Sequence, residues 1–262
     1  MQLIHGDCLE VMKSLEDNSI DLILCDLPYG TTDSNWDKAI PMPLLWKEYD
    51  RILTKTGTVI LFASGLFTPR VMCSNLKDYK YKLVWVKRTP TNFVHAKNRP
   101  MTKCEDILVF SKGSMGHKSL LGDKRMTYNP QGLIPCKKVQ KQGKSRFGTV
   151  TGNRVSHLKE DETFIREWTN YPCDVLTDFP DLPCNKKLHT NEKPVKLLEY
   201  LIKTYSNENE VVLDNCIGSG SCGEACIKTN RNFIGIELDE KYFNIAKDRI
   251  EKYLKDNIEG IE

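Results

Sequence analysis

The stretch Ile20-Asp21-Leu22-Ile23-Leu24-Cys25-Asp26-Leu27-Pro28-Tyr29-Gly30 decides the fold. Its first six residues are mostly apolar and branched, which predicts a strand buried on both faces of a parallel sheet. A chain that leaves such a strand enters the crevice at the strand's carboxyl end, where open α/β sheets bind ligands. We therefore expect the residues from Asp26 to Tyr29 to lie at a binding site.

The groups in this stretch suit a planar molecule with an exocyclic amine. The Asp26 carboxylate and the Leu27 carbonyl can each accept one N–H, and the Tyr29 ring can stack on the face of the molecule. Pro28 fixes the backbone between them. The alternative is a plain turn at the end of a strand, and on these residues alone the turn is the simpler interpretation. The rest of the chain reverses that preference.

A second motif lies nearer the carboxyl end of the sequence. Residues 211–214 predict a strand that enters a glycine-rich turn, and a helix through Lys228 and a strand ending at Glu237 follow. This order is typical of the nucleoside-binding half of a Rossmann-like sheet, in which glycines let a ligand approach the backbone at a helix N-terminus. Glu237 stands where a carboxylate can accept both hydroxyls of a ribose.

The chemistry of the turn favours one class of cofactor. Gly218 and Gly220 lie in the turn, and Asp214 ends the strand before it. A carboxylate at this position would repel a pyrophosphate, but it suits a ligand that carries an ammonium or sulfonium group. The turn therefore indicates S-adenosylmethionine rather than NAD. An NAD-dependent oxidoreductase is also disfavoured because no proton-transfer pair accompanies the turn.

The remaining elements follow from apolar periodicity. Asp7 stands at the N-cap of a first helix, and residues 31–38 read as a loop that could fold over the site with Trp36 as its anchor. Between residues 111 and 188 the periodicity fades, over a length that exceeds an ordinary connection inside a domain. The expected helices are 8–16, 43–53, one from about 68, 195–205, one through 228 and 239–254, and the expected strands are 3–5, 20–25, 58–62, 82–87, 106–110, 211–214 and 233–237.

Charge is segregated along the chain. The net charge is only +3, but residues 77–160 contain 19 Lys and Arg against 5 Asp and Glu, a net +14, and the remainder carries −11. So one-sided a block favours a polyanion as partner. The predicted loop 88–104 also mixes basic and aromatic residues, which suits nucleic-acid contact, although ordinary surface loops show the same mixture.

Composition bounds the other functions. The ten cysteines form no Cys-x-x-Cys pair and do not match common zinc or iron–sulfur spacings, so we expect reduced structural thiols and no metal. The first residues show neither a basic start nor an apolar run, and no apolar stretch approaches the roughly 20 residues that cross a bilayer. These features predict a soluble, cytoplasmic protein.

Taken together, the motifs resemble those of the S-adenosylmethionine-dependent amino-methyltransferases of DNA, which methylate adenine N6 or cytosine N4. Asp26-Leu27-Pro28-Tyr29 resembles their catalytic Asp-Pro-Pro-Tyr motif, with Leu27 in place of a proline of which only the carbonyl is used. The catalytic motif precedes the cofactor motif, as in the permuted beta group of this family. The resemblance implies a Rossmann-like class I methyltransferase α/β fold, circularly permuted, whose sheet is mostly parallel with an antiparallel edge strand.

The resemblance also implies an organisation and a set of site residues. Residues 1–111 would form the catalytic half, 112–188 an inserted basic target-recognition region and 189–262 the cofactor-binding half. The residues expected to bind the cofactor are Asp7, Asp26, Thr190, Lys193, Asp214, Cys216, Gly218, Ser219, Gly220, Ser221, Glu237 and Leu238. The basic residues expected to bind DNA are Lys87, Lys97, Arg99, Arg125, Lys137, Lys138, Lys144, Arg146 and Arg154.

The activity implied is methyl transfer from S-adenosylmethionine to adenine N6 in duplex DNA, after the base has been flipped out of the helix. Asp26 and the Leu27 carbonyl would hold the amine, and Tyr29 would stack on the base. Asp rather than Ser at the head of the motif favours adenine. Three alternatives stay open: cytosine N4, an RNA or protein amide, and a non-catalytic DNA-binding protein. The resemblance also suggests a homodimer.

Overall fold

The computed structural model describes residues 1–30, 39–116, 121–141, 163–181 and 192–259. The chain forms two compact units, one of residues 1–129 together with 174–262 and one of residues 130–173. The first unit contains both sequence motifs and is called the main unit. The loop with Trp36, which we expected to fold over the site, lies outside the described residues.

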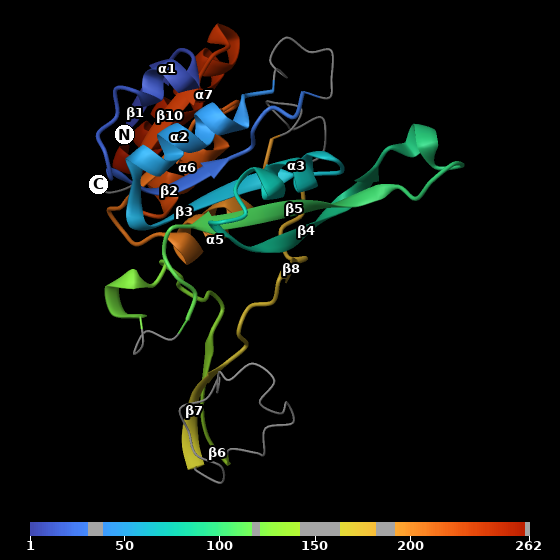
Figure 1. Cartoon of the computed structure of the whole chain (residues 1–262), viewed down its shortest axis with the longest axis vertical. Coiled ribbons are helices and arrows are strands. Elements are labelled where there is room, and N and C mark those ends of the chain that lie inside the picture. The colour runs from blue at the N-terminus through green and yellow to red at the C-terminus, as the bar shows by residue number, and fades with distance from the viewer. Residues whose placement is uncertain (31–38, 117–120, 142–162, 182–191, 260–262) are drawn as a thin grey trace. The chain divides into compact units, whose positions relative to one another are not determined.

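The described part of the main unit is built on an eight-stranded sheet (Figure 1). In order across the sheet the strands are β1 (Gln2–His5), β10 (Asn232–Glu237), β9 (Val211–Asp214), β2 (Ile20–Cys25), β3 (Leu53–Ala63), β5 (Thr102–Ser111), β4 (Tyr79–Thr91) and β8 (Val175–Leu176). The two motifs are therefore neighbours, because β2 pairs in parallel with β9 through Leu22 and Val212 and through Ile23 and Leu213.

The sheet is mostly parallel, as expected. Its reversed strand is β5, which runs antiparallel to β3 on one side and to β4 on the other. We expected an antiparallel strand at the edge of the sheet, and this detail is wrong. The reversed strand lies inside the sheet because β4 and the two-residue β8 continue the sheet beyond it, with β8 parallel to β4.

Helices cover both faces of the sheet, and alternate residues of β2 supply the two cores. Leu22 and Leu24 belong to the cluster on one face, whereas Ile23 and Cys25 belong to the cluster on the other. The first face is covered by α5 (Val195–Tyr205), α6 (Ser221–Lys228) and α7 (Glu240–Glu259), and the second by α1 (Cys8–Met12), α2 (Met42–Ile52) and α3 (Phe67–Ser74). Burial of β2 on both faces, which the sequence predicts, is confirmed.

The first helix is shorter than predicted. Asp7 caps α1, since its side chain accepts hydrogen bonds from the backbone N–H of Leu9 at 2.8 Å and of Glu10 at 3.3 Å. The helix ends at Met12, and its C-cap is Lys13. The predicted cap is therefore confirmed. The apolar spacing that predicted a helix to residue 16 continues past Met12, but the chain forms a turn there instead of a helix.

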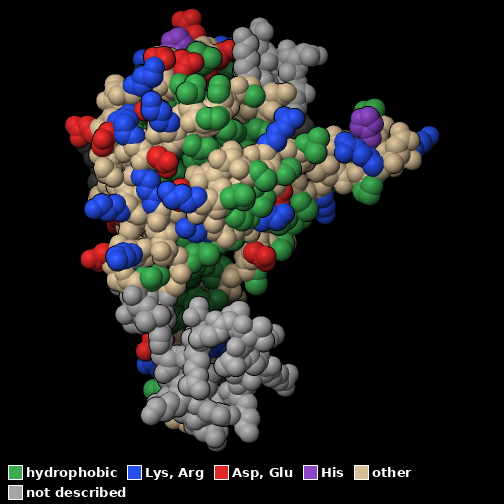
Figure 2. Space-filling view, in the orientation of Figure 1, with side chains coloured by type: hydrophobic (Ala, Val, Ile, Leu, Met, Phe, Trp, Pro, Cys, Tyr) green, Lys and Arg blue, Asp and Glu red, His purple; other side chains and the backbone are tan. Residues whose placement is uncertain are grey.

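The strands β4 and β5 are longer than predicted and form a hairpin that extends past the rest of the sheet (Figure 1). Pairing continues to Thr91 and Thr102, so both ends of the predicted loop 88–104 are strand and residues 92–101 form the connection. A short 3-10 helix, η1 (Phe93–His95), forms the tip. Figure 2 shows basic, histidine and hydrophobic side chains gathered on this tip.

The second unit lies within the expected insertion. It contains an antiparallel hairpin of β6 (Ile134–Lys141) and β7 (Thr163–Thr169), in which Val139 pairs with Ile165. The register shifts between Pro135 and Lys138, and Lys137 has a positive φ of 43° at that irregularity. Residues 112–129 and the segment from 174 belong instead to the main unit. A role of this unit in target recognition stays a prediction.

The described residues contain neither a membrane-spanning helix nor a cluster of metal ligands. None of the helices combines the length and the apolar character that a membrane span requires. In the same residues, no group of three or more His, Cys, Asp or Glu is placed to hold a metal ion.

Candidate active site

The ends of β2 and β9 border one pocket. Asp26 follows the last residue of β2, and Asp214 is the last residue of β9, so the topology brings both carboxylates to the carboxyl edge of the sheet. The pocket encloses about 450 Å³ that protein atoms do not fill, part of it open to solvent. Its lining is Leu24, Asp26, Phe62, Glu192, Lys193, Leu198, Asp214, Cys216, Ile217, Gly218, Ser219, Ser221 and Cys222.

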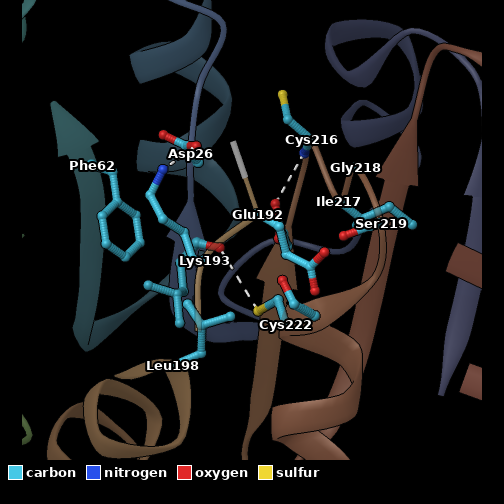
Figure 3. Close-up of a pocket in the computed structure, with 13 residues that line it drawn as sticks. Asp26, Phe62, Glu192, Lys193, Leu198, Cys216, Ile217, Gly218, Ser219 and Cys222 are labelled. Atoms are coloured by element: carbon cyan, nitrogen blue, oxygen red, sulfur yellow. Dashed lines mark hydrogen bonds and ion pairs between the residues drawn. The ribbon is translucent and has the colours of Figure 1, made fainter. Parts of the chain in front are cut away.

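Asp26 is held by two donors. Its Oδ2 forms an ion pair with the Lys193 ammonium, and its Oδ1 accepts a hydrogen bond from the Tyr29 hydroxyl at 3.3 Å. Figure 3 shows the Lys193 side chain passing the Phe62 ring and ending at Asp26, and the Lys193 Nζ lies 4.9 Å from the ring centroid. Burial raises the pKa of Asp26, and the positive charge of Lys193 opposes this rise.

A second carboxylate, which the sequence analysis missed, lies behind Lys193. Glu105 of β5 has its Oε2 3.5 Å from the Lys193 Nζ and its Oε1 2.5 Å from the Lys87 Nζ. Burial pushes the pKa of Glu105 upward, but the two ammonium groups outweigh burial and hold that pKa below its usual value. Burial would lower the pKa of Lys193, but Asp26 and Glu105 hold it above its usual value. Lys193 is therefore held as a cation.

The aromatic residue of the Asp26–Tyr29 motif is fixed by packing. The Tyr29 ring stacks on the Phe67 ring of α3, with centroids 4.4 Å apart and an interplanar angle of 21°. Since Phe67 covers one face of Tyr29, a base can stack only on the opposite face. The Leu27 side chain is buried in the core beneath α1 and α2, so the residue in place of the family's proline contributes packing.

The glycine-rich turn begins at a buried carboxylate. Asp214 accepts a hydrogen bond from the backbone N–H of Cys216 at 3.1 Å, and burial raises the pKa of Asp214 to about 7. On the next strand, Glu237 accepts from the backbone N–H of Gly218 at 2.9 Å and of Asp239 at 3.0 Å. The predicted strand–turn–strand motif therefore places both acidic groups against the turn.

The two glycines of the turn have different roles. Gly218 lines the pocket with a positive φ of 52°, which agrees with close approach of a ligand. Gly220 is outside the pocket lining, and a Cβ on it would lie 2.9 Å from the Cα of Ala246 in α7. Its φ is 79°, so it is required for a tight turn packed against a helix. The structure thus gives Gly220 a packing role, and its predicted contact with the cofactor stays a prediction.

A buried ion pair fastens the segment before α5 to the turn. Glu192, which lines the pocket, pairs with Arg249 of α7 at 2.6 Å. The same Arg249 donates to the Ser219 carbonyl at 3.3 Å and to Glu224 at 2.9 Å. Neither Glu192 nor Arg249 was predicted from the sequence. The feature that could have indicated Glu192 is its position directly before Lys193, which was predicted to bind the cofactor.

The other residues expected to bind the cofactor lie around the pocket rather than in its lining. Asp7 caps α1 and is exposed, and the exposed Leu238 follows Glu237, with its carbonyl 3.1 Å from the His5 Nε2. Thr190 lies outside the described residues. The rest of the set lines the pocket, apart from Gly220 and Glu237.

The residues expected to bind DNA fall into several groups. Lys97 and Arg99 are exposed at the tip of the β4–β5 hairpin, which leaves the sheet at the edge that carries Asp26. Lys137 and Lys138 are exposed on β6, and Arg125 is half-buried after η2 (Gly122–Lys124). Lys87 is engaged with Glu105 instead of lying on the open surface. Lys144, Arg146 and Arg154 lie outside the described residues.

This fold and this pair of motifs define a class of protein, and the comparison of families agrees with it. The DNA methylase family of N6 and N4 methyltransferases matches residues 20–248. The chain belongs to this family.

Individual relatives are similar over most of the chain. The Type II methyltransferase M.HpaI of Haemophilus parainfluenzae is 28% identical over 95% of this chain and 74% of its own length. The DNA adenine methyltransferase YhdJ of Escherichia coli K12 is also 28% identical, over 95% of this chain and 82% of its own. Among solved structures, the M1.HpyAVI–SAM complex superimposes with a TM-score of 0.59 at 24% identity, covering 95% of this chain and 98% of that one.

Proposed function

We propose that this protein transfers the methyl group of S-adenosylmethionine to N6 of adenine in duplex DNA. The observation that carries the proposal is the position of Asp26 and Asp214, which end neighbouring strands and border one pocket in a chain of the DNA methylase family. One carboxylate is placed for an amine, and the other adjoins a glycine-rich turn.

S-adenosylmethionine fits the pocket by the chemistry of its lining. Asp214 lines the pocket and Glu237 lies behind the turn, so these two carboxylates attract a ligand with ammonium and sulfonium charges. Asp214 and Glu192 would hold the charged amino-acid end, and Glu237 would hold the ribose. When bound, the cofactor supplies a methyl group on a positively charged sulfur.

The catalytic motif prepares the target amine. The lone pair of adenine N6 is delocalised into the ring, so the nitrogen is a poor nucleophile. Asp26 and the Leu27 carbonyl accept its two hydrogens, which draws the nitrogen towards tetrahedral geometry and fixes the direction of its lone pair. Tyr29 stacks on the base with the face that Phe67 leaves available. Positioning then supplies most of the rate.

Adenine is preferred over cytosine for two reasons. The motif begins with Asp26, and the resemblance to the family associates Asp rather than Ser at this position with adenine. YhdJ, which is named a DNA adenine methyltransferase, aligns with 95% of this chain. Cytosine N4 is the second candidate, since the family contains both kinds of enzyme.

The basic region supplies the affinity for DNA. Phosphate contacts from residues such as Lys97 and Arg99 would offset the few kcal/mol needed to unstack and unpair the base. An enzyme of this kind acts where the cell's DNA lies, which in a bacterium is the cytoplasm. We also propose a homodimer, which sedimentation of the purified protein would test directly.

The test is nucleoside mass spectrometry of unmethylated duplex DNA incubated with the protein and S-adenosylmethionine. We expect N6-methyladenine from the wild type, and at least about a hundredfold less product in the same time from the Asp26→Ala variant. N4-methylcytosine would keep the mechanism and overturn the choice of base. If neither product forms although the cofactor binds, the proposed activity on DNA is wrong.

A further inference from the structure

Four charged side chains alternate in sign behind the catalytic motif. Asp26 forms an ion pair with Lys193, Lys193 with Glu105, and Glu105 with Lys87. Asp26 follows β2, Glu105 and Lys87 belong to the β4–β5 hairpin, and Lys193 precedes α5. Three separate parts of the main unit therefore meet at one row of charges.

One acceptor in this row is left without a hydrogen bond. The Glu105 Oε2 is buried and is one of two such side-chain atoms in the described residues that lack a hydrogen-bond partner. It faces the Lys193 Nζ at 3.5 Å, which is an ion-pair distance but too long for a strong hydrogen bond. A buried acceptor left in this state destabilises the folded protein. A shift of the ammonium by less than an ångström would satisfy it.

The Lys193 ammonium meanwhile occupies the group that the target amine needs. Oδ2 of Asp26 accepts from Lys193 and Oδ1 accepts from the Tyr29 hydroxyl, so an incoming amine competes with donors already in place. The Phe62 ring, 4.9 Å from the Nζ, gives the ammonium a polarisable surface along which to move. Lys193 thus has a reason to leave Asp26 and a second carboxylate to receive it.

We propose that Glu105 is a positioning residue for methyl transfer, whose Oε2 receives the Lys193 ammonium when the target amine takes its place on Asp26. The exchange forms and breaks hydrogen bonds only, and the row keeps one positive charge for each negative charge throughout. Lys87 holds Glu105 in place through Oε1. This inference rests on the proposed function, because it requires an amine at Asp26.

The first test compares binding of two DNA duplexes in the presence of S-adenosylhomocysteine. One carries adenine at the target and the other carries purine, which lacks the amino group. The wild-type protein is expected to bind the adenine duplex about tenfold more tightly, because the amine satisfies Asp26. In Glu105→Gln the neutral amide no longer draws the ammonium away from Asp26, so the ratio of the two Kd values falls towards one.

Matched variants separate this role from a structural one. Lys82→Met removes a different ion pair of the same hairpin, the one with Asp106, and leaves the row of four charges intact, so the preference for adenine should persist. Lys193→Met removes the competing ammonium, and adding Glu105→Gln to it should leave the ratio unchanged. Thermal unfolding and cofactor binding of each variant report on folding.

Each outcome has a distinct meaning. If Glu105→Gln prefers adenine as strongly as the wild type does, the inference is wrong. It is also wrong if Glu105→Gln reduces the preference equally in the wild-type and in the Lys193→Met background. Failure of the wild-type protein to methylate DNA at all would instead count against the proposed function. A ratio near one in Glu105→Gln, with cofactor binding intact, supports the exchange.

Discussion

Two acidic residues end neighbouring strands of the same sheet, and their surroundings differ. Asp26 touches a cation, since the Lys193 ammonium lies on its Oδ2. Burial raises the pKa of both carboxyl groups, but Asp214 is held by a backbone amide instead of a cation, and its pKa rises to about 7. The charge of the Asp26 carboxylate is therefore compensated by Lys193. The Asp214 carboxylate is held by a backbone amide, so a positively charged ligand would stabilise it.

The difference explains which ligand each site can take. A carboxylate already paired with an ammonium can accept a hydrogen bond from a neutral amine without attracting a cation. A buried carboxylate with an elevated pKa is stabilised by a cationic ligand, because the ligand's charge favours the ionised form. The Asp26 site thus suits a nucleobase and the Asp214 site suits a sulfonium compound.

The strongest test of this contrast is removal of the catalytic carboxylate. Asp26→Ala should lower kcat for methyl transfer by about 10²- to 10³-fold, because the target amine loses its charged acceptor. Cofactor binding should stay nearly normal, since Glu105 remains beside Lys193 as a counter-charge. Calorimetry with S-adenosylmethionine and a methylation assay measure the two effects. Loss of both would mean that Asp26 supports folding instead.

The complementary change acts on the cofactor side. Glu237→Gln should weaken cofactor binding by about 10- to 100-fold, since a charged acceptor contributes about 1.5–3 kcal/mol to a hydrogen bond. At saturating cofactor kcat should be close to that of the wild type. The size of the side chain is kept, but glutamine has a single acceptor oxygen, so only one of the two backbone contacts, with Gly218 or with Asp239, can persist. A fall in kcat with an unchanged Kd for the cofactor would mean that Glu237 acts in methyl transfer and not in cofactor binding.

The pH dependence of cofactor binding tests the state of Asp214. Below pH 7 this carboxyl becomes protonated in the free protein and no longer attracts a cation. Affinity should therefore fall as the pH is lowered from 8 to 6, by at most about tenfold per pH unit. Titrations of the wild type and of Asp214→Asn give the comparison. The variant should bind more weakly at pH 8 and show a flatter profile.

The smallest expected effect concerns the DNA side of the Asp26 site. Lys97→Ala or Arg99→Ala should reduce the slope of log Kd against log salt concentration by about one. Lys55→Ala is the matched control, because Lys55 is exposed near the start of β3, at the opposite edge of the sheet. An equal change of the slope in Lys55→Ala would mean that the tip of the β4–β5 hairpin does not contact DNA phosphates.

Much of the site could be predicted because its residues follow short apolar strands. The runs before Asp26, Asp214 and Glu237 are buried strands, and topology alone brings their ends to one edge. Asp7 was predictable for a similar reason, since a cap depends on residues two and three positions away.

The remainder depends on contacts that no local pattern reveals. Glu105 and Lys193 are 88 positions apart in the sequence and meet only because β5 is inserted between β3 and β4. The role of Gly220 follows from Ala246 on a different helix. The two residues of β8 are too few for any period to be seen. Packing, rather than propensity, decides each of these.

The order of the strands has a consequence for biosynthesis. β2 ends at residue 25 and its neighbour β9 begins at residue 211, so about 10 to 40 s of translation separate them at ordinary rates of elongation. During this interval β2 has an open edge, and Leu22 and Leu24 lack the helices that later cover them. The growing chain cannot modify DNA before its last strands emerge. Two separately expressed halves, divided in the insertion, would likewise be inactive until they reassociate. The fold could therefore serve as a split reporter of association.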